Sequence, residues 1–321
     1  MGSEMCIRDS EKILTNKDLE KIVDTTDEWI RTRSGIEERR IAEDDECTSD
    51  MGYKAAERAI LSAGIKKEDI DMIIVATITP DYPWPSSACI IERKLGLKNI
   101  PVFDISAACS GFIYALSVAS SFIKLGEYKN ILVVASEKFS KFVDWEDRGT
   151  CVLMGDGAGA FIVGESEESE IIATYLAADG NYLELLYQPG GGSKIPFSKE
   201  VLDKRLQFMK MNGKEIYKLA VEKMPDALNR VFEKTKISPD KIDHVIFHQA
   251  NIRIIESIAK RYNWPKEKVI INIQRYGNTS AATIPIAYAE AVEQGRIKKG
   301  DLVAFSAIGG GITWAAALIK V

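Results

Sequence analysis

"IKKEDIDMIIVAT" (Ile65–Thr77) and "ISPDKIDHVIFHQ" (Ile237–Gln249) share an isoleucine, an Ile-Asp pair and a following apolar strand, at an offset of 237 − 65 = 172 residues. The likeness continues downstream: "VFDISAACSGFIYALSVASSFI" and "INIQRYGNTSAATIPIAYAEAV" each join a short apolar strand, a small-residue turn and an alanine-rich helix. Another apolar strand follows each, at Asn130–Ser136 and Asp301–Ala307. Four elements that recur in the same order predict a duplicated unit.

The apolar runs decide the fold class. Strands without polar alternation are typical of sheets buried on both faces, so we expect helices on both sides of parallel sheets. We therefore predict a duplicated α/β fold with halves at residues 1–165 and 166–321, joined by the charged link "GESEESE". The glycines of "MGDGAGAFIVGE" imitate a dinucleotide loop, but a strand follows them instead of a helix, so we interpret them as a turn.

Composition narrows the class of protein. The chain of 321 residues is 46% hydrophobic and 28% charged, which is typical of a soluble globular protein. It contains no apolar run of the roughly 18 residues that span a bilayer, and its first ten residues lack the apolar core of a signal peptide. A net charge of −5 gives no overall attraction for nucleic acid. Five scattered cysteines without a CxxC pair argue against disulfides or a metal site and fit the cytoplasm.

Two residues stand in equivalent turns of the predicted repeat. Cys109 of "SAACSGF" precedes a predicted helix, whose free N–H groups and dipole are expected to lower the thiol pKa. Asn278 of "GNTSAAT" occupies the other turn. If a pseudo-twofold axis relates the halves, these turns face each other. Taken alone, Cys109 also fits a buried packing thiol, and Asn278 an ordinary turn residue.

One of only two histidines lies beside this pair. His248 ends the predicted strand "HVIFH", and its ring together with the Asn278 amide provides two neutral donors suited to stabilising an enolate. The backbone N–H groups of Gly309–Gly311 can approach closely because no Cβ intervenes. Taken alone, His248 also fits a buried core histidine, and Gly309–Gly311 a tight loop. Their joint placement favours a reaction centre.

Six motifs in this order resemble the β-ketoacyl-acyl-carrier-protein synthase III family from about Glu11 to Val321: "DTTDEWIRTRSGI", "DISAACSGF", "DRGT", "HQANIRII", "GNTSAA" and "GGGITW". The resemblance implies a thiolase-like fold layered αβαβα. It also implies that Cys109 accepts an acyl group, usually acetyl, from coenzyme A, and that His248 and Asn278 assist decarboxylation of malonyl-acyl-carrier-protein. The N–H groups of Cys109 and Gly310 would form the oxyanion hole. Coenzyme A is then a substrate, and neither a cofactor nor a metal is expected.

The resemblance also implies binding residues. The coenzyme A contacts would be Thr25, Trp29, Arg33, Arg148 and Asn251, and the acidic carrier would dock on Lys218, Arg253, Lys260 and Arg261. Trp29 and Arg33 are four residues apart, on one face if the segment is helical, although an amphipathic surface helix gives the same pattern. Members of the family are homodimers, and Trp84 resembles the residue that enters the partner's acyl pocket. A bulky Trp84 favours a short primer.

Other hypotheses about the function remain open. A thiolase would need a second cysteine in "SAIGGGITW", and elongating condensing enzymes use histidines in two separate segments. A ketide- or quinolone-type synthase shares Cys-His-Asn, as do cysteine hydrolases, and a non-catalytic acyl-binding relative is a third alternative. The sequence departs from the family at "MGSEMCIRDS", which shows neither β-alternation nor the family's glycine turn. If these ten residues are native sequence, we expect the first sheet strand to be missing there.

Overall fold

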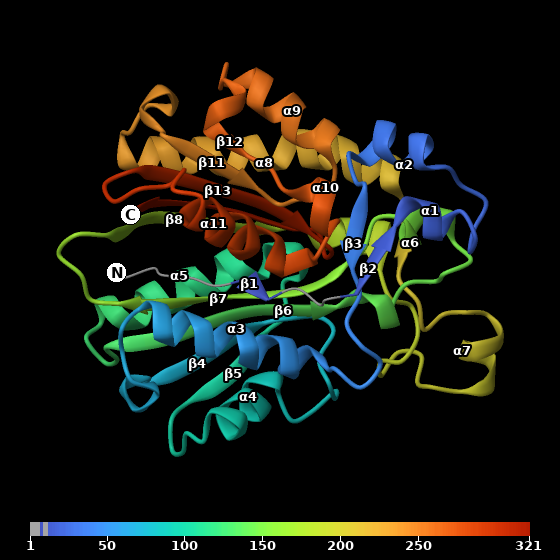
Figure 1. Cartoon of the computed structure of the whole chain (residues 1–321), viewed down its shortest axis with the longest axis horizontal. Helices are drawn as coiled ribbons and strands as arrows, with labels where there is room; N and C mark the ends of the chain where they lie inside the picture. The colour runs from blue at the N-terminus through green and yellow to red at the C-terminus, as the bar shows by residue number, and fades with distance from the viewer. Residues whose placement is uncertain (1–6, 9–11) are drawn as a thin grey trace.

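The computed structural model describes residues 7–8 and 12–321 and contains two five-stranded sheets (Figure 1). The first sheet has the order β1-β7-β6-β4-β5 and the second β8-β14-β13-β11-β12, so each strand has a counterpart at the same place. The strands of the first sheet are β1 (Ile7–Arg8), β4 (Met72–Ala76), β5 (Val102–Ile105), β6 (Asn130–Lys138) and β7 (Asp156–Gly164). Those of the second are β8 (Glu170–Ala178), β11 (His244–Phe247), β12 (Val269–Ile270), β13 (Leu302–Gly309) and β14 (Thr313–Lys320).

The remaining strands form two small antiparallel pairs, β2 (Ile13–Thr15) with β3 (Glu38–Arg40) and β9 (Leu186–Tyr187) with β10 (Lys210–Met211). The helices are α1 (Asn16–Leu19), α2 (Asp27–Ser34), α3 (Thr48–Ser62), α4 (Ser87–Leu95), α5 (Gly111–Lys124), α6 (Arg148–Cys151), α7 (Lys199–Asp203), α8 (Gly213–Thr235), α9 (Ile252–Arg261), α10 (Ile273–Tyr276) and α11 (Thr283–Glu293). Two 3₁₀ turns matter for function: η2 (Ala108–Ser110) before α5 and η7 (Ser280–Ala282) before α11.

The elements stack in five layers, αβαβα (Figure 1). Helices α5 and α11 lie between the two sheets and share one apolar core with the inner faces of both. Helices α3 and α4 cover the outer face of the first sheet, and α8 and α9 cover that of the second. Because each sheet carries helices on both faces, its central strands are apolar throughout, as the sequence predicted.

The strand registers show how closely the halves agree. Met72 of β4 pairs with Ile131 of β6, and His244 of β11 pairs with Val303 of β13, a separation of 59 residues in each case (131 − 72 and 303 − 244). The offset of 172 relates β4 to β11, η2 to η7 and the starts of α5 and α11, since 244 − 72, 280 − 108 and 283 − 111 all equal 172. The repeat seen in the sequence is therefore also a repeat in space.

Two expectations are corrected. The sheets are mixed and not purely parallel, because β7 and β14 run antiparallel to their neighbours. A first strand is present: Ile7 and Arg8 pair with Gly159 and Ala158 of β7, so the prediction of a missing strand is wrong for these two residues. The rest of "MGSEMCIRDS" lies outside the described residues.

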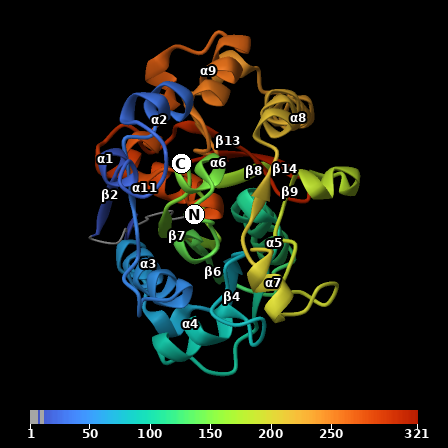
Figure 2. The same ribbon diagram turned by 90° about the vertical axis from the view of Figure 1, so that its right-hand side faces the viewer.

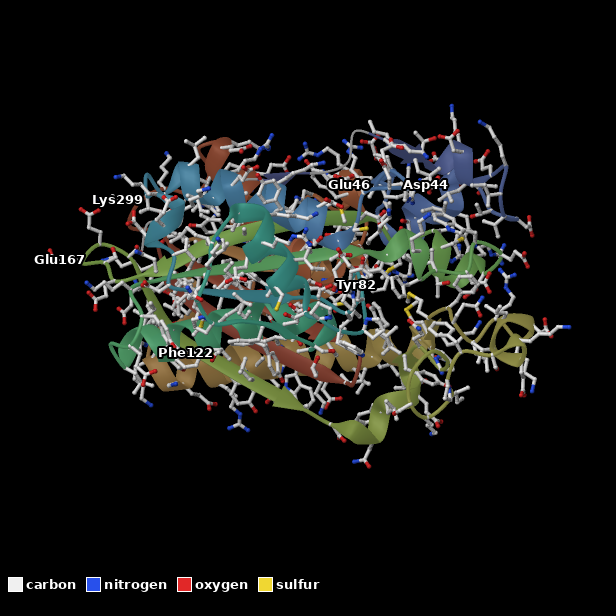
Figure 3. All side chains as sticks on the ribbon, turned by 90° about the horizontal axis from the view of Figure 1, so that it is seen from below. Asp44, Glu46, Tyr82, Phe122, Glu167 and Lys299 are labelled. Atoms are coloured by element: carbon white, nitrogen blue, oxygen red, sulfur yellow. The ribbon has the colours of Figure 1, made fainter. Side chains whose placement is uncertain are left out.

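Residues 165–169 connect β7 of the first sheet to β8 of the second at one end of the molecule, where Glu167 and Lys299 lie (Figure 3). Lys299 forms an ion pair of 2.6 Å with Glu168 in this link. At the other end α7 projects from the molecule (Figure 1), and residues of the β9–β10 pair line the reaction centre described below.

Candidate active site

Cys109 lies in η2, at the start of α5, and is only 6% exposed. Burial raises the pKa of its thiol to about 12, an effect that the neighbouring Ser280 side chain partly opposes. The expectation of a lowered pKa is therefore wrong, because removal of the sulfur from water outweighs the favourable helix end. At neutral pH the Cys109 thiol carries its proton.

Asn278 is held by the opposite half of the protein. Its backbone N–H donates to the Leu153 carbonyl at 2.8 Å, and its carbonyl accepts from the Gly155 N–H at 3.0 Å. Its side-chain Oδ1 accepts from the Ser280 N–H at 2.8 Å. Because Oδ1 is occupied, the Asn278 amide group Nδ2 remains as the donor available to a ligand.

Glycines permit this close approach of the two halves. A Cβ on Gly155 would stand 2.4 Å from the Tyr276 carbonyl oxygen, and one on Gly277 would stand 2.9 Å from the Leu153 carbonyl oxygen. Gly155 of "MGDGAGA" thus lets the backbone that carries Asn278 approach, and it is no part of a phosphate loop. The strand β7 begins directly afterwards at Asp156.

The last glycine segment packs against Cys109. A Cβ on Gly309 would stand 2.6 Å from the backbone nitrogen of Cys109 and 3.0 Å from the Ala108 Cβ. Gly310 follows at the turn between β13 and β14 and lines the same cavity as Cys109 and Asn278. Two segments distant in sequence therefore meet at the cysteine.

His248 directly follows β11 and is 4% exposed. Burial lowers the pKa of its ring to about 3, so the imidazole is neutral. Its Nδ1 lies 2.7 Å from the Thr283 hydroxyl, whose single proton goes either to Nδ1 or to the Ser280 carbonyl at 2.9 Å. The Thr283 N–H already donates to that carbonyl. Donation from the hydroxyl to Nδ1 therefore leaves no acceptor unpaired.

The cavity beside Cys109 has a volume of about 220 Å³. Apart from Cys109, Asn278 and Gly310, its wall consists mostly of apolar side chains, among them Phe139, Phe142, Met154, Leu186 and Met209. Such a wall suits a short hydrocarbon chain attached to the sulfur. His248 is not among the residues that line this cavity; its ring contacts Thr283, whose backbone N–H donates to the Ser280 carbonyl.

A second, larger cleft of about 670 Å³ shares Met211 with this cavity, so the two adjoin. Helices α2, α8 and α9 border it, and α2 lies beside α9 (Figure 2). Among the described residues that line it are four cations and no carboxylate: Arg33, Lys214, Lys218 and Arg253. Asn251 lines the cleft as well, where its side chain caps α9.

Trp29 forms part of the wall of this cleft and contacts two guanidinium groups. The Cζ atoms of Arg33 and Arg148 lie 4.5 and 4.8 Å from its ring centroid. The segment is helical, as α2, and it places Trp29 and Arg33 together. Thr25 precedes this helix with a buried hydroxyl that has no hydrogen-bond partner among the described residues.

The predicted carrier-docking residues separate into two groups. Lys218 and Arg253 line the cationic cleft, whereas Lys260 and Arg261 lie at the other end of α9. Lys260 lines a separate groove. Trp84 lies in the loop after β4 and is 84% exposed, away from the cavity of its own chain.

Sequence reasoning missed three residues that connect the centre: Ser280, Thr283 and Glu137. The Ser280 side chain neighbours the Cys109 sulfur, and its backbone N–H donates to Asn278. Its carbonyl accepts from the Thr283 N–H, and the Thr283 hydroxyl contacts His248. The offset of 172 was the available signal, since it aligns Ser280 with Ala108, the residue before Cys109. In the described part of the chain, no cluster of histidine, cysteine, aspartate or glutamate is arranged to hold a metal, and no helix has the length and apolarity to cross a membrane.

Comparisons with known proteins agree with this architecture. Two family models match, 3-oxoacyl-[acyl-carrier-protein] synthase III at residues 103–180 and its C-terminal domain at residues 232–321. The β-ketoacyl-[acyl-carrier-protein] synthase III of Caldanaerobacter subterraneus is 52% identical over 97% of this chain and 94% of its own. The crystal structure of the Aquifex aeolicus synthase III has a TM-score of 0.92 at 49% identity, covering 99% of this chain and 98% of that one.

The duplicated five-layer fold, with a cysteine at the contact of its two halves, defines a condensing enzyme of the thiolase fold. Within that class, the two family models and the relatives at about 50% identity all indicate one family. The chain belongs to the β-ketoacyl-acyl-carrier-protein synthase III family.

Proposed function

We propose that this enzyme starts fatty-acid synthesis by condensing an acyl-CoA primer with malonyl-acyl-carrier-protein, through an acyl group held on Cys109. The observation that carries the proposal is the junction of an apolar cavity containing Cys109 with a cationic cleft lined by Trp29. The cavity suits the acyl chain. The cleft suits the phosphates and the adenine ring of coenzyme A, because guanidinium groups pair with phosphate and stack on rings.

In the first half-reaction, the Cys109 sulfur attacks the thioester carbonyl and coenzyme A leaves. The developing oxyanion accepts hydrogen bonds from the N–H groups of Cys109 and Gly310. The close packing of Gly309 on the Cys109 nitrogen supports this arrangement. Thr25, Arg148 and Asn251 complete the proposed coenzyme contacts around Trp29 and Arg33.

In the second half-reaction, His248 Nε2–H and Asn278 Nδ2–H donate to the malonyl thioester oxygen. They stabilise the enolate that forms as carbon dioxide leaves. The neutral imidazole and the occupied Oδ1 of Asn278 support these donor roles. Thr283 donates to His248 Nδ1 and so keeps the ring proton on Nε2. The enolate carbon then attacks the Cys109 thioester and releases the β-ketoacyl product.

The primer is a short acyl group, with acetyl as our first choice, because the cavity holds only about 220 Å³. No resident cofactor or metal takes part in this mechanism. We place the reaction in the cytoplasm, where reduced thiols persist, since the four described cysteines are all unpaired. Residues 1–165 supply the nucleophile in this scheme, and residues 166–321 supply His248 and Asn278.

The carrier protein is acidic and approaches, in this proposal, over Lys218, Arg253, Lys260 and Arg261. All four side chains are at least partly exposed, and Lys218 and Arg253 stand at the cleft that its pantetheine arm must enter. A second copy of the chain is the other proposed partner. The strand β5 lies at the edge of its sheet with both faces half-buried, and the exposed Trp84 follows the neighbouring strand β4.

The test uses acetyl-CoA and mass spectrometry. We expect an acetyl adduct on Cys109 that persists until malonyl-acyl-carrier-protein is added and then leaves as acetoacetyl-carrier product. Rapid loss of the adduct to water would favour a thioester hydrolase, and no adduct in wild type would favour a non-catalytic acyl-binding protein. A product formed on another acceptor would favour a ketide synthase. That alternative has a structural neighbour, the priming ketosynthase of the R1128 polyketide pathway, at 31% identity and a TM-score of 0.92.

A further inference from the structure

Glu137, near the end of β6, is a carboxyl group with no exposed surface. One of its oxygens accepts from the Thr79 hydroxyl at 2.6 Å, the Thr77 hydroxyl at 3.1 Å and the Ile78 N–H at 3.1 Å. The other accepts from the Ser280 hydroxyl at 3.0 Å. All four donors are neutral. A buried carboxylate without a cation is costly, so its retention beside the reaction centre calls for an explanation.

Ser280 connects this carboxyl group to the nucleophile. Its hydroxyl donates to Glu137 at 3.0 Å and neighbours the Cys109 sulfur, because η2 and η7 pack together and the Ser280 side chain lowers the pKa of the Cys109 thiol. A hydroxyl carries one proton and can accept another, so it can take a proton from the sulfur as it passes its own to Glu137. Cys109, Ser280 and Glu137 come from η2, η7 and β6, and they form a continuous path.

The chemistry requires such a path, because a thiol must lose its proton to attack a thioester. Burial holds the pKa of the Cys109 thiol at about 12 and lowers the pKa of His248 to about 3. The imidazole is thus a poor acceptor. The same burial raises the pKa of Glu137 to about 7, which makes it the stronger base of the two.

We propose that Glu137 accepts the Cys109 proton through the Ser280 hydroxyl, holds it while the enzyme is acylated, and returns it when the cysteine leaves. The inference rests on the acyl-transfer function proposed above. In acylation, the S–H bond breaks, the sulfur bonds to the acyl carbon, and the carboxylate becomes a carboxylic acid. Coenzyme A departs as a thiolate and takes a proton from water.

Condensation closes the cycle. Malonyl loses carbon dioxide, and the electron pair of the broken C–C bond forms the new bond to the acyl carbon. The Cys109 sulfur leaves with the electrons of its thioester bond. Glu137 then gives its proton back through Ser280, so the thiol and the carboxylate are both restored and the negative charge of malonate ends on Glu137. Atoms and charge balance over the cycle, with water supplying the one proton that coenzyme A takes up.

The ionisable neighbours of Glu137 do not provide a competing route. Lys138 follows it on β6, but its ammonium binds the main-chain carbonyls of Glu43 and Glu46. Asp156, opposite Lys138 on β7, accepts from the N–H groups of Ser140 and Ala42. From η2 the ionisable group that faces Glu137 is the Cys109 thiol, and from the β4 loop and η7 only hydroxyl and amide donors contact it.

The decisive measurement is the rate of Cys109 alkylation by iodoacetamide as a function of pH, which needs neither substrate. In wild type we expect the rate to rise as pH increases through about 7, where Glu137 ionises. Glu137→Gln and Ser280→Ala should each lack this step at pH 7, so that their rates only follow the slowly growing thiolate fraction, and should react roughly 100-fold more slowly near pH 7. Asp156→Asn removes a different buried carboxylate and should react like wild type.

The opposite outcome has a definite meaning. Glu137 also acts as a buried negative charge that raises the Cys109 pKa, so if it is only that, Glu137→Gln will react faster than wild type. Equal or faster alkylation in Glu137→Gln would overturn the relay, provided that near-ultraviolet circular dichroism shows a native fold. Ser280→Ala keeps its Cβ and provides the independent second variant.

A spectroscopic readout tests where the proton is stored. Infrared difference spectra of wild type before and after acylation by acetyl-CoA should gain the carbonyl stretch of a protonated carboxyl group, and Glu137→Gln should not. Absence of this band in acylated wild type would overturn the storage step. Failure of acetyl-CoA to acylate wild type would instead count against the proposed function. The alkylation result stands apart from both.

Discussion

Ala108 and Ser280 are 172 residues apart (280 − 108) and both adopt left-handed backbone conformations, with φ of 46° and 51°. Few residues other than glycine do so, because the Cβ is crowded there. Both residues begin a 3₁₀ turn that leads into a central helix, and the two turns pack together. The left-handed residue puts Cys109 directly after it in one half. In the other half the left-handed residue is Ser280, which hydrogen-bonds to Asn278 and Glu137 and neighbours the Cys109 sulfur.

Removal of either proposed enolate donor should separate the two half-reactions. In His248→Ala and Asn278→Ala we expect condensation with malonyl-carrier to fall roughly 100-fold or more, because a donor to the developing oxyanion is lost. Acylation of Cys109 by acetyl-CoA should persist in both variants. Single-turnover mass spectrometry measures both steps, and an equal loss of acylation and condensation would contradict the assigned roles.

The hydrogen bond between Thr283 and His248 should matter for rate. Thr283→Val removes the hydroxyl that lies 2.7 Å from Nδ1 and should lower the condensation rate about tenfold, as expected for loss of a buried hydrogen bond. Thr279→Val is the matched control, since the Thr279 hydroxyl is buried without a partner among the described residues. Steady-state kcat with saturating substrates compares the two, and similar effects would remove the orienting role.

Gly309 should tolerate no side chain. In Gly309→Ala the new Cβ would lie 2.6 Å from the Cys109 nitrogen, so the loop must shift and the oxyanion donors separate. We expect acylation to slow roughly 100-fold. Gly192→Ala, where a Cβ would meet nothing within 4 Å, should leave acylation unchanged. Stopped-flow release of coenzyme A reports the rate, and a normal rate in Gly309→Ala would argue against an oxyanion hole at this contact.

Charge reversal should distinguish the two substrates. Lys260→Glu with Arg261→Glu should raise KM for malonyl-carrier more than KM for acetyl-CoA, because these residues lie away from the cleft. Arg33→Ala should raise KM for acetyl-CoA about tenfold through loss of a charged contact. Both effects should weaken as salt increases. Equal changes in the two KM values for the Lys260 and Arg261 variant would remove the docking proposal.

The stability of Glu137→Gln should depend on pH. The pKa of Glu137 is raised from 4.5 to about 7 in the folded protein, so between these values the native state binds more protons than the unfolded state. Wild-type stability therefore falls as pH rises across that window, while the glutamine variant lacks this loss. We expect the Tm difference, variant minus wild type, to be larger at pH 8.5 than at pH 6. Scanning calorimetry gives both values, and a constant difference would show that Glu137 titrates normally.

The duplicated arrangement of strands and helices could be predicted because the two halves of the sequence share a repeat. The offset of 172 is visible in the residues, and it alone places the Cys109 and Asn278 turns opposite each other. The sequence also shows where the two halves differ. The offset of 172 pairs Cys109 with Ala281, His248 with Ala76 and Thr283 with Gly111. Each reactive residue has a small counterpart, so one copy of each group remains. The mixed strand directions were missed, since apolar runs carry no information on direction.

The sequence by itself determined the duplicated α/β architecture and the three residue types suited to acyl transfer, because repeat and motif are local properties of the chain. Only the tertiary structure decided that the Cys109 thiol is protonated, that a cationic cleft adjoins its cavity, and that Ser280 connects it to Glu137 across 143 residues. The physical reason is that burial and hydrogen bonding depend on every segment that surrounds an atom. Those segments come together only on folding.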